Sequence, residues 1–134
     1  MNGIVSLDDL LQSLDPELGE EQFVFCTASG SIGDYADLNP VAVLKEEEGL
    51  TLILPLAVAE SEALAFEGPF RKITLKVHSS LDAVGLTAAV STQLAAQGIP
   101  ANVVAGYYHD HLFVPSASAE QALSLLHELS RSCS

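Results

Sequence analysis

Apolar residues recur at helical spacing in three stretches of the chain. Between Ser6 and Leu14, leucines follow the i, i+3, i+4, i+7 spacing that places side chains on one helix face. The same spacing extends over Asp82–Gln97, and it returns in the segment after Pro115. We therefore predict a short N-terminal helix, a long central helix and a C-terminal helix, each with one buried stripe.

Runs rich in β-branched and aromatic residues predict strands elsewhere. The clearest alternation lies between Arg71 and His78, where Ile73, Leu75 and Val77 would face a core and the residues between them would face solvent. The predicted strands are Gln22–Ala28, Val41–Glu46, Leu50–Leu54, Arg71–His78, Ala101–Tyr107 and His111–Val114.

Glycine and proline mark the connections between these elements. Ser29–Pro40 combines glycines, aspartates and Asn-Pro, which predicts a loop with one helical turn inside it. Phe66–Phe70 contains Gly-Pro and predicts a linker. Pro55 suits the first turn of a short helix that ends near Leu64, and Gly98 suits the C-terminal end of the long helix.

Two segments repeat the same order of elements. Val41–Leu64 and Asn102–Leu126 both predict strand, tight turn, strand, proline, helix, with Pro55 matching Pro115. Antiparallel hairpins covered by helices on one face indicate an α+β fold. We predict two fused halves. Residues 1–68 hold the N-terminal helix and a first, shortened repeat, in which a loop replaces one helix. Residues 69–134 hold the second repeat.

Composition narrows the range of partners. The chain has 134 residues, and 49% of them are hydrophobic, which is enough for a sizeable core. The formal charge is −13, with only five Lys and Arg residues. Nucleic acid and anionic membrane surfaces are therefore not expected as partners, because both are bound through basic patches.

The ends of the sequence and its cysteines point to the cytoplasm. The N-terminus has no basic region followed by an apolar run, so we expect no signal peptide, and no apolar run is long enough to span a membrane. Cys26 lies in a predicted buried strand and Cys133 lies next to the C-terminus, so no disulfide is expected. We predict a soluble cytoplasmic protein.

The segment Ser79–Leu86 is a candidate anion site. A predicted strand ends there and a helix begins, so free backbone N–H groups and the positive end of the helix dipole would attract a carboxylate or phosphate. Capping by Ser80 or Asp82 explains the same residues without a ligand. Gly85 in the first helical turns would cost stability unless a ligand or another part of the backbone approaches closely.

The histidines suggest a second kind of site. His109 and His111 would share one face of a strand, and His78 could lie nearby, so a transition metal is one hypothesis. A turn with hydrogen-bonding histidines explains the pattern more simply, and we favour it. Neither a nucleophile elbow nor a phosphate-binding glycine loop occurs in the sequence. We therefore expect no catalytic residues, no cofactor and no enzymatic activity.

The sequence resembles a known family at these residues. The segment LDAVGLTAAVSTQLAAQGIPANVVAGYYHDHLFVP, up to Pro115, is similar to the ACT domain family. It resembles most closely the small bacterial proteins with two tandem ACT-like repeats and the related CASTOR-type arginine sensors. KEEEGLTLILP, from Lys45 to Pro55, is similar to the first repeat of the bacterial group. The resemblance implies a ferredoxin-like βαββαβ unit present twice.

The resemblance also implies where a ligand would bind. ACT domains bind amino acids at repeat or subunit interfaces. The backbone from Leu81 to Leu86 would hold the ligand carboxylate, and Asp110 matches an acidic position that contacts the ligand in the arginine sensors. The predicted ligand-binding residues are Ser80, Leu81, Asp82, Val84, Gly85, Leu86, Asn102, Val103, Val104, Ala105 and Asp110.

Three functional hypotheses follow, in this order. The first is a stand-alone regulatory protein that binds a small molecule, expected to be an amino acid, and acts on an unidentified protein target, with a homodimer as the expected assembly. The second is a metal-dependent enzyme or a metal-binding protein that uses His78, His109 and His111. The third is a structural interaction module without a ligand.

Overall fold

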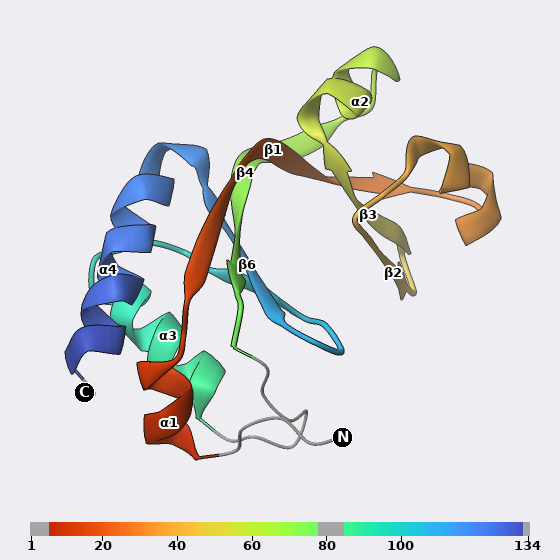
Figure 1. Ribbon diagram of the computed structural model, residues 1–134. Helices are drawn as coiled ribbons and strands as arrows, with labels where there is room; N and C mark the ends of the chain where they lie inside the picture. The colour runs from red at the N-terminus through yellow and green to blue at the C-terminus, as the bar shows by residue number, and fades with distance from the viewer. Residues whose placement is uncertain (1–5, 78–84, 133–134) are drawn as a thin grey trace. The chain divides into compact units, whose positions relative to one another are not determined.

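The computed structural model describes residues 6–77 and 85–132 (Figure 1). Its α-helices are α1 (Leu7–Gln12), α2 (Leu56–Ser61), α3 (Leu86–Ala95) and α4 (Ala119–Ser132), and two 3₁₀ helices are η1 (Ile32–Leu38) and η2 (Ser116–Ser118). The strands are β1 (Pro16–Ala28), β2 (Ala42–Glu46), β3 (Gly49–Pro55), β4 (Phe66–Leu75), β5 (Asn102–Ala105) and β6 (Asp110–Pro115).

The chain divides into two compact units. Unit 2 is Glu21–Phe70, and unit 1 is formed by the residues before and after it. Strands β1 and β4 are neighbours in the sheet, and each passes through both units. Unit 1 is therefore discontinuous in sequence, since it takes the start of β1 and the end of β4.

Unit 1 packs three helices against a sheet of order β1-β4-β6-β5. Figure 1 shows α1, α3 and α4 together on one side of these strands. Leu10 and Leu11 of α1 join a core to which β4 gives Ile73 and Leu75, and β6 gives Leu112 and Val114. The buried stripe of α3 is Leu86, Val90 and Leu94. The amphipathic spacing in the sequence is thus satisfied by one shared core.

Unit 2 repeats this arrangement on a smaller scale. Its strands run in the order β2-β3-β1-β4, and β3 pairs antiparallel with both β1 and β2. Val24 and Cys26 of β1 and Leu52 and Leu54 of β3 form the core, covered by Ala59 of α2. The 3₁₀ helix η1, which takes the place of a full helix, adds Tyr35 and Leu38 to the rim of this core.

The internal repeat is confirmed down to the register of its hairpins. Val43 pairs with Leu52 in the first hairpin and Val103 with Leu112 in the second, so the two registers differ by a constant 60 positions. The prolines that follow have nearly the same backbone, with φ and ψ of −55° and 138° at Pro55 and −53° and 135° at Pro115. The same local chemistry therefore ends each strand and starts each helix.

Two expectations about the elements were wrong. Phe66–Phe70 is the first half of β4 and not a linker, since the strand continues through Gly68-Pro69. Helix α3 begins at Leu86, with Gly85 as its N-cap, and the predicted start at Asp82 lies outside the described residues. Strand β1 begins at Pro16, six residues before the predicted start at Gln22.

The boundary between the sequence repeats, expected between residues 68 and 69, stays a prediction. In the described part of the chain, no helix is both long and apolar enough to cross a membrane.

Leu112→Ala is expected to lower the free energy of unfolding by about 2–5 kcal/mol, because the side chain is fully buried in unit 1 and its removal leaves a cavity. Urea denaturation measures the loss. Val103→Ala is the matched control: Val103 faces Leu112 across the hairpin but is 37% exposed, so the loss should stay below about 1 kcal/mol. Equal losses in the two variants would contradict this packing.

Candidate functional site

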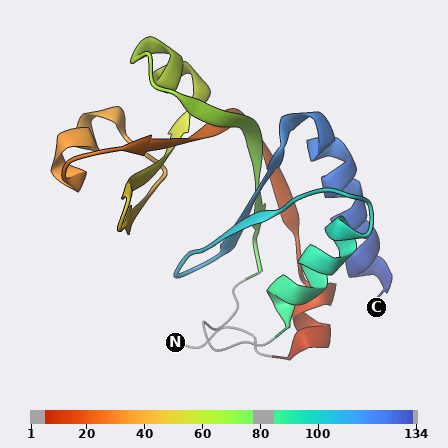
Figure 2. The same cartoon turned by 180° about the vertical axis from the view of Figure 1, so that it is seen from behind.

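The hairpin β5–β6 carries most of the predicted site residues that the structure describes. Its turn is closed by the Gly106 N–H, which donates to the His109 carbonyl oxygen at 2.9 Å. A Cβ at Gly106 would lie 2.8 Å from that oxygen, so a glycine is required there. Figure 2 shows the two strands side by side with this turn at their free end.

The hairpin brings Asn102, Val103, Val104, Ala105 and Asp110 together. Ala105 pairs with Asp110 next to the turn, and Asn102 pairs with Phe113 at the other end. The Asn102 side chain donates to the Phe113 carbonyl oxygen at 3.2 Å, so its amide supports the hairpin. Of this set, Asp110 supplies the ionisable group.

Asp110 occupies a position that is apolar in the first repeat. With the 60-residue offset it corresponds to Leu50, which is buried in the core of unit 2. Burial raises the pKa of the Asp110 carboxyl, and the charge of the neighbouring His109 lowers it by a smaller amount. Burying a carboxylate in this way costs folding free energy, which is typical of a functional position.

The two hairpin histidines differ in their contacts. His111 Nδ1 lies 2.9 Å from the Thr74 hydroxyl oxygen on β4. Burial lowers the pKa of His111, and the positive charges of Lys72, His109 and Lys76 lower it further, so a neutral ring is favoured. The Nδ1 atom of His109 is buried and, in the described residues, has no hydrogen-bond partner.

The predicted metal site is not assembled in the part of the chain that the structure describes. Those residues contain no group of three or more His, Cys, Asp or Glu side chains that could hold a metal ion. His78, the third expected ligand, lies outside the described residues. The metal hypothesis therefore stays a prediction, and elemental analysis of untagged protein would test it.

Of the candidate anion site, Ser79–Leu86, the structure describes only the last two residues. Ser80, Leu81, Asp82 and Val84 lie outside the described residues. Gly85 has a φ of 98°, and a Cβ there would lie 3.2 Å from the Leu7 side chain. The neighbour at this glycine is the Leu7 side chain of α1, whereas we expected another part of the backbone or a ligand. Leu86 is buried in the core of unit 1, so its side chain serves packing.

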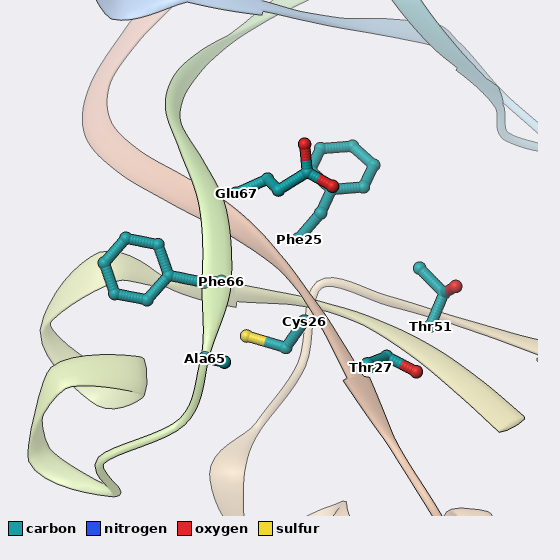
Figure 3. A pocket seen from close by; sticks show the side chains of 7 residues that line it. All are labelled: Phe25, Cys26, Thr27, Thr51, Ala65, Phe66 and Glu67. Atoms are coloured by element: carbon teal, nitrogen blue, oxygen red, sulfur yellow. The ribbon is translucent and has the colours of Figure 1, made fainter.

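The structure adds an open cavity in unit 2 that the sequence interpretation missed (Figure 3). Its volume is about 420 Å³, and its lining comes from β1, β3 and the start of β4. Phe25, Thr27 and Thr51 contribute to the lining, as do Phe66 and Glu67. The only sequence feature that could have indicated this cavity is the aromatic Phe66 and the charged Glu67 next to Gly68-Pro69, in the segment predicted to be a linker.

Comparison with protein families identifies the class. The ACT domain model matches residues 2–71, and a second ACT domain model matches residues 67–128. The chain therefore belongs to the ACT domain family and carries two ACT domains in tandem. This confirms the expected α+β architecture, a duplicated ferredoxin-like fold with helices against antiparallel strands.

Solved structures agree with this assignment. A Vibrio cholerae protein of unknown function, described as a possible transport protein, is 52% identical, with a TM-score of 0.87 over 96% of this chain and 99% of that one. An Agrobacterium tumefaciens protein has a TM-score of 0.72 at 18% identity, covering 86% and 87% of the two chains. The comparison with curated proteins found no match.

A third neighbour shares the fold. The regulatory subunit of aspartate kinase from Thermus flavus has a TM-score of 0.60 at 11% identity, covering 85% of this chain and 95% of that one. At this identity the likeness shows the fold alone. The two ACT domains support a regulatory, ligand-binding role in general.

Asp110→Asn is expected to stabilise the protein at pH 7. Since burial raises the carboxyl pKa in the folded state, the folded protein binds this proton more tightly than the unfolded chain, and the ionised form costs folding free energy above that pKa. The advantage of the variant should shrink as the pH falls through the raised pKa toward the ordinary value of 3.8. Urea unfolding at pH 7 and near that value measures both effects.

Asp8→Asn is the control for this prediction. Asp8 is exposed in the first turn of α1, where a negative charge favours the helix, so its loss should leave stability at pH 7 unchanged or slightly lower. A loss of stability at pH 7 in Asp110→Asn would show that the carboxylate supports the fold and would contradict the prediction.

Proposed function

We propose that the protein is a regulatory protein that binds an amino acid and has no catalytic activity of its own. The family assignment supports the regulatory part, because both halves of the chain match ACT domains. The half-buried carboxylate of Asp110 supports the proposal of an amino-acid ligand, since it stands where the first repeat has the apolar Leu50.

The proposed ligand has opposite charges at its two ends. Asp110 would accept hydrogen bonds from an amine or guanidinium group, and backbone N–H groups between Ser80 and Leu86 would hold a carboxylate. The strands around Asn102–Ala105 would line the space between them. The resemblance to CASTOR-type arginine sensors makes a basic amino acid the first candidate, and Asp110 is the residue that would select it.

Regulation requires a partner to receive the signal. We propose a homodimer and an unidentified protein target in the cytoplasm. The order of strands supports a further contact, because β2 and β5 are the outermost strands of the sheet. Outer strands present unpaired backbone groups, and proteins commonly cover them with a second copy or a partner.

A thermal-shift screen of the twenty amino acids tests this function. At least one of them should raise the melting temperature, because a ligand that binds the folded state at one hundred times its dissociation constant stabilises it by about 2.7 kcal/mol. Asp110→Ala should weaken that response by about tenfold or more in affinity, since a charge-assisted hydrogen bond is lost.

Asp8→Ala is the matched control, because it removes an exposed carboxylate of unit 1 and should leave the response unchanged. If none of the twenty amino acids shifts the melting temperature, the protein is not an amino-acid sensor, and the interaction module without a ligand becomes the better hypothesis. An unchanged response in Asp110→Ala would remove this residue from the site.

A further inference from the structure

The open cavity of unit 2 has the size and composition of a ligand site. Its volume of about 420 Å³ falls within the range of roughly 300–1,000 Å³ that small-molecule pockets occupy. The surface of its lining is mostly apolar, and a single carboxylate and two hydroxyl groups provide its polar side chains. All its lining residues belong to unit 2, whereas Asp110 belongs to unit 1.

One wall combines an aromatic ring with a carboxylate. Figure 3 shows the Glu67 side chain leaving β4 on the side where the ring of Phe25 lies, with Phe66 directed to the opposite side. The Phe25 ring packs edge to face against Phe70, with ring centroids 5.2 Å apart and planes at 70°. This contact fixes the ring before any ligand arrives, which lowers the entropic cost of binding.

Two hydroxyl groups lie on the same side of the strands as Phe25 and Glu67 (Figure 3). They belong to Thr27 and Thr51, which face each other across the β1–β3 pair. The Thr51 hydroxyl donates to the Glu46 carboxylate, which brings a second negative charge near the rim. The Cys26 thiol points away from them into the core of unit 2, and burial raises its pKa.

The charge of the whole unit favours positive ligands. Residues 21–70 contain nine Asp and Glu residues and one basic residue, Lys45, which is not among the lining residues. The seven lining residues include no Lys, Arg or His. A negative field over an apolar cavity concentrates cations and repels carboxylates and phosphates.

We propose that this cavity binds an organic amine, a single ammonium group on an apolar or aromatic body, without a carboxylate. The ammonium would pair with Glu67 and lie against the ring of Phe25, and the apolar body would extend along the strands toward Thr27 and Thr51 on the same side. An amino acid does not fit this chemistry, because its carboxylate would meet negative charge and no basic side chain. The cavity is thus a second site, chemically distinct from the proposed site at Asp110.

Phenethylamine and phenylalanine make a matched pair of probes, since they differ only in the carboxylate. Titrated into ¹⁵N-labelled protein, phenethylamine should shift the amide signals of Thr27, Thr51 and Glu67 and saturate them. Phenylalanine at the same concentrations should leave those signals in place, and 2-phenylethanol, which lacks the charge, should bind at least tenfold more weakly.

Two variants locate the binding. Glu67→Gln should weaken phenethylamine by about tenfold and leave 2-phenylethanol unchanged, so that a folding defect is told apart from the loss of charge. Glu62→Gln removes an exposed carboxylate of the same unit outside the cavity and should change neither affinity.

Several results would overturn the proposal. They are the absence of saturable shifts at these amides, equal binding of phenethylamine and phenylalanine there, and equal affinity of Glu67→Gln and the parent protein. Because Asp110→Ala leaves this cavity intact, failure of the amino-acid screen and failure of the amine titration can be told apart.

Discussion

The antiparallel pairing of β1 and β4 is the constraint on which the rest of the structure depends. The Lys76 N–H donates to the Asp15 carbonyl oxygen at 3.2 Å at one end of the pair. Toward the other end, a Cβ on Gly68 would lie 3.2 Å from the Phe23 carbonyl oxygen, so the two backbones are still in close contact. Strand β4 gives Ile73 and Leu75 to the core of unit 1. Strand β1 gives Val24 and Cys26 to the core of unit 2, and its Leu18 packs against the core of unit 1.

The two repeats preserve one packing scheme while their chemistry differs. At equivalent positions both repeats have buried aliphatic residues, such as Leu52 and Leu112. Ala59 of α2 and Ala119 of α4 are also equivalent, and both are fully buried. The difference lies beside the hairpin turn, where Leu50 corresponds to Asp110. A carboxylate at a position that packing would fill with leucine lowers stability, and natural proteins retain such costs mainly where a site requires them.

The sequence allowed the fold class and the repeat to be predicted, because both depend on local signals. The alternation in β4 and the apolar stripe of α3 are periodic patterns of the sequence. The two prolines act on the residues next to them, so their effect is local as well. The start of α3 and the strand through Gly68-Pro69 could not be predicted in this way. The Leu7 side chain, which is far away in sequence, leaves little room for a Cβ at Gly85. The β structure around Pro69 depends on pairing with β1. The cavity near Glu67 could not be predicted either, because its lining residues come from strands that are separated in sequence.

The discontinuity of unit 1 has a consequence for the order in which the chain is made. Synthesis delivers α1 first, but the partners of Leu10, Leu11 and Leu14 lie in β4, α3, β6 and α4, which emerge more than fifty residues later. Unit 2 is continuous and can form earlier from residues already available. Nascent chains should therefore pass through a stage in which α1 exposes its leucines, and such segments are targets for chaperones.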